Sequence, residues 1–317
     1  MENHSACEIN MENYSACEIT WRSDMKIAIA SGKGGTGKTT VSLNLALSLS
    51  DVQLDVQLDV QLFDCDVEEP NCNLFLGFDL EKVEDVVCPV PVIDQEKCNI
   101  CRQCSDFCRY NALAALPNRV LFFPSLCHGC GGCAVLCPEK AIQESYRSLG
   151  VIEKAKGKSS PEFYRGLLNI GETMTSAVIK ALKKHIDSRK TAILDAPPGT
   201  SCPVIASVDD VDYCVLVTES TLFGFHDLKL AVGVVRALKI PFGVIINRWG
   251  LGDSRVEEYC KAEGIPVLLK IPNDLRIAEL YSRGIPFVQE MPGWKEQFLG
   301  MFEAIKLQLA GVEEEIT

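Results

Sequence analysis

Residues 26–40 read KIAIASGKGGTGKTT, which combines a short apolar run, a glycine-rich loop and the start of an apolar-striped segment. The apolar run predicts a buried strand, and the stripe in residues 38–50 predicts a helix. Between them, residues 32–39 fit the phosphate-binding pattern G-x-x-x-x-G-K-S/T. Glycines let backbone N–H groups approach phosphates, Lys38 would reach the β- and γ-phosphate oxygens, and Thr39 would bind Mg²⁺. The predicted nucleotide-binding residues of the loop are Gly32, Lys33, Gly34, Gly35, Thr36, Gly37, Lys38, Thr39 and Thr40.

Strands and helices alternate along the chain on both sides of one cysteine-rich segment. Residues 172–188 predict a helix, and several short apolar runs predict strands. Strands that alternate with helices form a parallel sheet with helices on both faces, so we expect an α/β fold built on a P-loop sheet. The further predicted strands are 191–194, 213–217, 242–246 and 266–269.

Three copies of Asp-Val-Gln-Leu fill residues 51–62. A parallel strand rarely needs that length, and identical copies specify the pairing register poorly. We expect the last copy to form the strand, because Asp64 and Asp66 then lie at its carboxyl end, where such sheets bind ligands. The first two copies, residues 51–58, are therefore expected to be functionally silent.

Two cysteine runs lie in a proline-bounded segment, residues 89–147, which interrupts the α/β domain. Both runs have the spacing C-x2-C-x2-C-x3-C of bacterial two-cluster ferredoxins. Zinc is less favoured, because it typically uses two separated pairs of ligands for one ion. The spacing therefore predicts two 4Fe–4S clusters. The cysteines are Cys98, Cys101, Cys104 and Cys108 in the first run, and Cys127, Cys130, Cys133 and Cys137 in the second.

Composition and charge exclude several classes of function. The chain has 317 residues, a formal net charge of −12, and no apolar run near the roughly 18 residues that span a bilayer. This charge argues against nucleic acid as a partner, and the acidic end at residues 313–315 argues against a membrane surface. The first residues lack a secretory signal, so we expect the 16 cysteines to be cytoplasmic thiols, with metal binding as their chemistry.

The glycine loop carries two lysines, Lys33 and Lys38, and resembles the deviant Walker A loop of the MinD/ParA/Mrp and nitrogenase iron-protein ATPases. The resemblance covers roughly residues 25–88 and 148–300. In that family, the first lysine crosses a dimer interface and adds positive charge where the transition state gains negative charge. The resemblance therefore implies that Lys33 acts on the nucleotide of a partner, in a homodimer or in a heterodimer with a sister protein.

Further residues match the same family. The segment DCDVEEPN, which starts at Asp64, resembles its first switch, in which the second aspartate, here Asp66, positions the attacking water. The segment DAPPGT, which starts at Asp195, resembles the second switch, whose aspartate lies near Mg²⁺. Asn247 matches the position that reads adenine, and Gly250 stands where a guanine reader needs aspartate, so ATP is expected. The catalytic residues that the resemblance implies are Lys33, Lys38, Asp66 and Asp195.

The cysteine runs resemble those of two-cluster ferredoxins, in which each cluster takes its fourth ligand from the other run. The first run departs from the pattern, because Arg109 stands where proline usually follows. The resemblance assigns Cys98, Cys101, Cys104 and Cys137 to cluster one. It assigns Cys127, Cys130, Cys133 and Cys108 to cluster two.

The whole chain thus resembles a MinD-superfamily ATPase that carries an inserted ferredoxin-like domain. One implied function is electron transfer to an unknown redox partner, controlled by a nucleotide-driven dimer. The alternative is an ATP-dependent carrier that delivers clusters or a metallocofactor to an apo-protein. Complete four-cysteine sets favour the first, because cargo clusters are usually held by few ligands, and the acidic C-terminus disfavours a membrane-positioning role like that of MinD. The expected parts are a disordered duplicated tail at 1–24, ATPase segments at 25–88 and 148–312, and the ferredoxin-like insert at 89–147.

Overall fold

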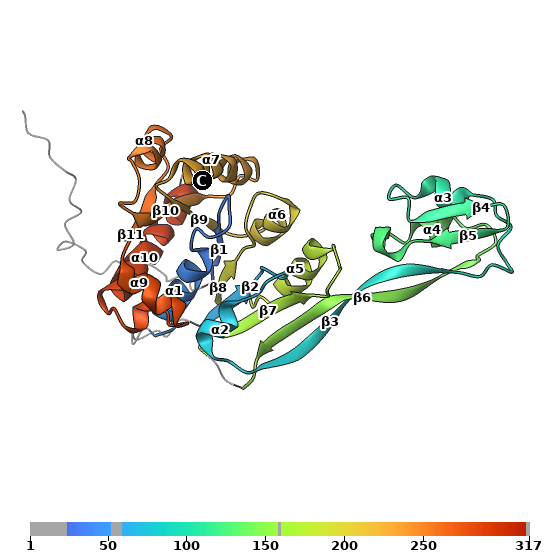
Figure 1. Cartoon of the computed structure of the whole chain (residues 1–317), viewed down its shortest axis with the longest axis horizontal. Coiled ribbons are helices and arrows are strands. Elements are labelled where there is room, and N and C mark those ends of the chain that lie inside the picture. The colour runs from blue at the N-terminus through green and yellow to red at the C-terminus, as the bar shows by residue number, and fades with distance from the viewer. Residues whose placement is uncertain (1–23, 52–58, 158–159, 315–317) are drawn as a thin grey trace, which may run out of the picture.

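The structure, a computed structural model, describes residues 24–51, 59–157 and 160–314. The expected disordered tail, except for its last residue, lies outside the described residues. The first two Asp-Val-Gln-Leu copies, except for Asp51, also lie outside them. In the described ranges, a large lobe is built on a nine-stranded sheet, and a two-stranded arm carries a small lobe away from it (Figure 1).

Seven parallel strands form the main part of the sheet. Most of their residues are buried, and most of the buried ones are apolar, as expected for parallel strands that are covered on both faces. In sheet order they are β11 Val267–Pro272, β10 Phe242–Trp249, β9 Tyr213–Glu219, β1 Lys26–Ala30, β8 Thr191–Asp195, β2 Val60–Asp64 and β7 Glu162–Leu168.

The strand order places the candidate nucleotide site at the centre of the sheet. β1 pairs with β8 on one side and β9 on the other, and β8 also pairs with β2. Since parallel strands have their carboxyl ends at the same edge, the segments that follow β1, β2 and β8 meet there. The last Asp-Val-Gln-Leu copy forms β2, as predicted, and Asp64 ends that strand.

Helices cover both faces of this sheet, which confirms the predicted α/β fold. One buried apolar cluster joins one sheet face to the helices on that side, among them α1 and the C-terminal helix α10. A second cluster joins the opposite face to α5, α6, α7 and α8. On the first side the helices are α1 Lys38–Ser50, α2 Cys72–Leu76, α9 Leu275–Ser282, the short 3₁₀ segment η3 Phe287–Gln289 and α10 Gly293–Glu314. On the second side they are α5 Thr175–Lys183, α6 Cys202–Val208, α7 Leu222–Ala237 and α8 Arg255–Ala262.

The helix predicted at 172–188 is shorter than expected at both ends. At its start, the Glu172 carboxylate accepts hydrogen bonds from the backbone N–H groups of Thr173 and Met174, and α5 begins after them. At its end, the Asp187 carboxylate accepts the N–H of Arg189, so a local turn replaces the last helical turn. Both ends of α5 are therefore set by carboxylates that accept hydrogen bonds from nearby backbone N–H groups.

Two antiparallel strands extend the sheet beyond β7, where the sequence predicted only parallel strands. β3 Leu80–Ile93 and β6 Ile142–Ala155 pair along their whole length, and β6 also pairs antiparallel with β7. The sequence did not predict β3, because Pro89 and Pro91 cannot donate backbone hydrogen bonds and therefore argue against a strand. In the structure, both prolines lie on the outermost strand of the sheet. These two strands are the arm seen in Figure 1.

The small lobe lies between the far ends of β3 and β6 (Figure 1). A two-stranded sheet and three short helical segments form it, and each cysteine run contributes one of its two α-helices. The elements are α3 Gln103–Phe107, β4 Leu113–Leu116, β5 Arg119–Phe122, the 3₁₀ segment η2 Pro124–Leu126 and α4 Gly132–Leu136.

Candidate functional site: a nucleotide loop and two cysteine pockets

The phosphate-binding loop connects β1 to α1, and three of its glycines have a backbone conformation or a close contact that disfavours a side chain. Gly35 and Gly37 have φ of 76° and 96°, a region that residues with a Cβ rarely adopt. A Cβ on Gly32 would lie 2.1 Å from the backbone oxygen of Asp227, in the second turn of α7. Within the described chain, α1 receives no side-chain cap, so the N–H groups at the start of this 13-residue helix fit a phosphate.

Lys38 begins α1 and is almost fully enclosed, with 7% of its surface exposed. Burial lowers the pKa of its amine, although the charges of Asp195 and Asp66 act in the opposite direction. A buried cation is costly unless an anion accompanies it, so this position fits the negative charge of a phosphate.

Asp195 ends β8 and binds two hydroxyls of α1. The Thr39 hydroxyl donates to Oδ2 at 2.7 Å, and the Ser42 hydroxyl donates to Oδ1 at 2.9 Å. Asp64 is its register partner on β2, and both carboxylates are buried. Burial raises the pKa of Asp195, and burial together with the Asp195 charge raises the pKa of Asp64 to about 7. Two such carboxylates beside a hydroxyl fit a site for Mg²⁺, whose charge would favour their ionised forms.

Asp64 also organises the segment that carries Asp66. Its carboxylate accepts backbone N–H groups from Asp66 at 3.2 Å, Asn71 at 2.9 Å and Cys72 at 2.9 Å. Burial, with the charge of Asp195 adding to it, raises the pKa of Asp66 to about 6. A carboxyl group that titrates near neutrality suits the positioning of an attacking water. This role of Asp66 stays a prediction.

Lys33 contacts its own chain rather than open solvent. Its amine forms an ion pair with Glu219, at the end of β9, and about a quarter of its side chain is exposed. Glu219 is nearly buried and also binds Arg248 at 3.0 Å. The predicted action of Lys33 on a partner's nucleotide therefore requires that it first leave Glu219.

Asn247 lies against the loop. Its side-chain nitrogen donates to the carbonyl oxygen of Thr36 at 2.7 Å, and its side-chain oxygen accepts the N–H of Arg248 at 2.9 Å. A Cβ on Gly37 would lie 2.2 Å from the same nitrogen. Asn247 therefore fixes the loop by direct contact, and its predicted reading of adenine stays a prediction.

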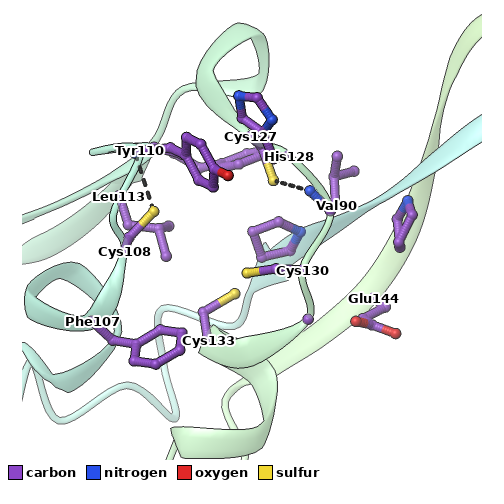
Figure 2. Close-up of a pocket in the computed structure, with 16 residues that line it drawn as sticks. Val90, Phe107, Cys108, Tyr110, Leu113, Cys127, His128, Cys130, Cys133 and Glu144 are labelled. Carbon is purple, nitrogen blue, oxygen red and sulfur yellow. Dashed lines mark hydrogen bonds between the residues drawn. The ribbon is translucent and has the colours of Figure 1, made fainter. Parts of the chain in front are cut away.

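The eight predicted ligand cysteines line two separate pockets in the small lobe, with four in each. In Figure 2, the labelled thiols of one pocket point toward a common space. In both pockets, three cysteines come from one run and the fourth from the other, which is the expected crossed arrangement. One pocket holds Cys98, Cys101, Cys104 and Cys137. The other holds Cys108, Cys127, Cys130 and Cys133.

The two runs have the same backbone geometry around their cysteines. Three residues with left-handed φ follow the first cysteine at matching positions in each run. Ile100 is one of them, and a β-branched residue adopts this conformation only where the surroundings require it. The matching residues are Ile100, Arg102 and Asn111 in the first run, and Gly129, Gly131 and Lys140 in the second.

Backbone donors also reach the sulfurs in a matching way. The N–H of Ala112 donates to Cys108 Sγ at 3.4 Å, and the N–H of Ala141 donates to Cys137 Sγ at 3.3 Å. Burial raises the pKa of the Cys133 thiol to about 11, so the charge of a bound metal would be needed to stabilise its thiolate. Four convergent thiols with N–H donors to sulfur fit an iron–sulfur cluster in each pocket.

Comparison with known proteins identifies the family. The model of the CobQ/CobB/MinD/ParA nucleotide-binding domain matches residues 27–287. The chain belongs to this family. An uncharacterised protein of Methanocaldococcus jannaschii is 32% identical over 268 residues, which cover 84% of this chain and 92% of that protein.

Two further relatives show how far the likeness extends. An iron-sulfur cluster carrier protein of Pyrococcus horikoshii is 25% identical, over 83% of this chain and 79% of that protein. The septum site-determining protein MinD of the same organism, solved with Mg-ADP, has a TM-score of 0.53 and 22% identity, and covers 91% of this chain and 98% of its own. This likeness concerns the fold. Family and fold together make the chain an ATP-binding P-loop ATPase of the MinD/ParA type.

Several residues of this MinD/ParA-type site were missed by the sequence analysis. Glu219 binds Lys33, Ser42 binds Asp195, and the thiol of Cys72 lies 3.5 Å from the same carboxylate. A signal for Glu219 was present, because it is a charged residue two positions after the predicted apolar strand 213–217.

None of the helices in the described part of the chain has the length and apolar character that crossing a bilayer requires.

Proposed function

We propose that this ATPase couples ATP hydrolysis to electron transfer through two 4Fe–4S clusters in a ferredoxin-like insert. The observation that carries the proposal is the pair of complete, crossed four-cysteine pockets on an arm continuous with the ATPase sheet. Each cluster, when bound, would carry one electron at a time from a one-electron donor to a one-electron acceptor. We assign cluster one to Cys98, Cys101, Cys104 and Cys137, and cluster two to Cys127, Cys130, Cys133 and Cys108.

The nucleotide chemistry is assigned to residues that meet at the carboxyl edge of the sheet. Lys38 and the loop N–H groups would bind phosphate oxygens, and Thr39 would bind Mg²⁺ through its hydroxyl oxygen, while the same hydroxyl donates a hydrogen bond to Asp195. Asp66 would orient the water that attacks the γ-phosphate, which yields ADP and inorganic phosphate. Asn247 would contact adenine while it supports the loop.

The proposal includes a dimer, either of two copies or with a sister protein. In it, Lys33 would leave Glu219 and bind the nucleotide of the partner. Lys33 already lies at the phosphate loop, and an ion pair with a single carboxylate can be exchanged for one with a triphosphate. Closure of this dimer would give the ATP cycle a mechanical output.

A second candidate is an ATP-dependent carrier of clusters or of a metallocofactor for an apo-protein. It is favoured by the relatives named iron-sulfur cluster carrier protein, in Pyrococcus horikoshii and in Aquifex aeolicus, which are 25% and 27% identical to this chain. The number of ligands argues against it, because a cluster bound by four cysteines, three of them half-buried in each pocket, is released slowly.

One experiment separates the two candidates. The protein is purified anaerobically with ⁵⁷Fe- or ³⁵S-labelled clusters, and EPR spectra are recorded with and without MgATP. The electron-transfer proposal predicts cluster signals that respond to nucleotide and label that stays with the protein. If the cluster signals do not change with nucleotide and the label passes to an apo-acceptor, the carrier function would replace the electron-transfer proposal.

A further inference from the structure

An arginine on the arm contacts both lobes. Arg147 lies on β6, opposite Cys88 on β3. One guanidinium nitrogen forms an ion pair with Glu172, and another donates to the carbonyl oxygen of Cys127 at 3.4 Å. Both side chains are largely enclosed, with 20% of Arg147 and 7% of Glu172 exposed. A planar guanidinium in such an enclosed ion pair has a defined geometry, which a solvated surface pair lacks.

On the side of the small lobe, Arg147 contacts the loop that begins the second cysteine run. Cys127 is a proposed ligand of cluster two, and its sulfur accepts the N–H of Gly129 at 3.5 Å. The loop packs closely on the arm, since a Cβ on Gly129 would lie 2.5 Å from Cys88 Sγ and 3.0 Å from the Pro89 carbonyl oxygen. A positive charge at this loop stabilises the reduced, more negative state of a bound cluster, so displacement of the guanidinium would change the reduction potential.

On the side of the ATPase lobe, Glu172 is connected to the first switch segment. Its other carboxylate oxygen fixes the start of α5, because it accepts the N–H groups of Thr173 and Met174 at 2.8 and 3.3 Å. In the first turn of α5, the Thr175 hydroxyl donates to Glu68 at 3.2 Å. Glu68 belongs to the switch segment, so a short chain of polar contacts joins that segment to Arg147.

A second set of contacts follows the same route. The N–H of Leu168, at the end of β7, donates to the Val67 carbonyl oxygen at 2.9 Å. A Cβ on Gly166 would lie 2.6 Å from Val67 Cγ1, so the switch segment packs directly on β7. The N–H of Asn169 then donates to the Leu149 carbonyl oxygen of β6 at 2.8 Å. Movement of Val67 would therefore displace the β7–α5 connection that holds Glu172.

We propose that Arg147 and Glu172 transmit the nucleotide state of the first switch to cluster two. The inference rests on the proposed function, because it needs both the ATP cycle and a cluster bound by Cys127. When bound ATP draws the switch segment toward its γ-phosphate, Glu172 shifts with the start of α5, and the guanidinium changes its position at the Cys127 carbonyl. The contact of Arg147 is with the second run, so the midpoint potential of cluster two responds to nucleotide and that of cluster one stays constant. Arg147 acts here as a positioning residue.

The test is a redox titration followed by EPR on the full chain, purified anaerobically with both clusters. Midpoint potentials are measured with MgADP and with a non-hydrolysable MgATP analogue, and Cys130→Ala identifies the signals of cluster two by their loss. The wild type should show a nucleotide-dependent shift in cluster two. Glu172→Gln keeps the shape of the side chain and removes its charge, so that shift should be lost while basal ATP hydrolysis is retained.

Two further variants make the result specific. Arg147→Lys keeps the charge without the planar fork, so it should retain both clusters and lose most of the nucleotide-dependent shift. Glu153→Gln is the matched control. Glu153 also lies on β6 and forms an ion pair with Arg165 of β7 at 2.7 Å, but neither residue belongs to the cysteine runs. In this control variant, the nucleotide-dependent shift in the midpoint potential of cluster two should equal that of the wild type.

The outcomes separate this inference from the proposed function. Loss of the shift in Glu172→Gln and its retention in Glu153→Gln support transmission through Arg147. An undiminished shift in both Glu172→Gln and Arg147→Lys would overturn the inference and leave ATP-coupled electron transfer standing. A wild type with both clusters and constant potentials would overturn it as well. Iron far below the roughly eight atoms of two clusters would overturn the proposed function and the inference together.

Discussion

Glu219→Gln should strengthen the proposed nucleotide-dependent dimerisation, because the ion pair with Glu219 competes with the proposed contact between Lys33 and a partner's nucleotide. The ion pair is well shielded, with 28% of the Lys33 side chain and 9% of the Glu219 side chain exposed. A hydrogen bond to a charged group contributes about 1.5–3 kcal/mol, and a neutral one about 1 kcal/mol. The substitution therefore lowers the cost of releasing Lys33 by about 0.5–2 kcal/mol, which is roughly a 2–30-fold decrease in the dimer Kd for each Lys33 released.

Sedimentation velocity with a non-hydrolysable MgATP analogue measures this Kd directly. Arg248→Gln is the matched control, because Arg248 shares Glu219 and half of its side chain is exposed. Its removal leaves Lys33 paired more firmly, so dimerisation should be unchanged or weaker. In the double variant with Lys33→Ala, the gain from Glu219→Gln should disappear. A Glu219→Gln protein that dimerises no more tightly than the wild type would refute the reasoning.

Three further predictions follow from the site. Gly37→Ala should abolish ATP binding in calorimetry, because φ is 96° and a Cβ would lie 2.2 Å from a buried side-chain nitrogen; retained affinity would contradict the loop geometry. The folded state raises the pKa of Asp64 from 3.8 to about 7, so it binds this proton more tightly than the unfolded chain. The thermal stability of the nucleotide- and Mg²⁺-free protein should therefore decrease as the pH rises from about 4 to about 7, and Asp64→Asn should flatten that profile. The double variant Cys98→Ala with Cys137→Ala should lose about four iron atoms, whereas Cys98→Ala with Cys108→Ala should lose about eight, if the ligand sets are crossed.

Local patterns predicted much of the nucleotide site. The glycine loop, the strand before it and the helix after it depend on nearby residues, and α1 occupies the predicted range 38–50. Asp64 and Asp195 could be anticipated together, because both end apolar strands and parallel strands end at one edge. The spacing of the cysteines predicted two cluster sites, and the resemblance to two-cluster ferredoxins predicted which four thiols share a pocket.

Contacts between distant parts of the chain could not be read in the same way. Glu219 lies 186 residues after Lys33, and no local pattern pairs them. The arm was missed because β3 is an edge strand with prolines and exposed charged residues, so it lacks the apolar run that marks the central strands. Arg147 could not be predicted either, because its partners meet only when β6 pairs with β7 and the second cysteine run packs on the arm.

A stopped-flow measurement tests whether ATP turnover and electron transfer are linked in this protein. The protein, with its clusters reduced, is mixed with a one-electron acceptor and either MgATP or MgADP, and cluster oxidation and phosphate release are followed in one turnover. Coupling predicts that the clusters are oxidised faster with MgATP than with MgADP, at the same rate as phosphate is released. Equal oxidation rates with the two nucleotides, from protein that hydrolyses ATP and holds both clusters, would contradict it.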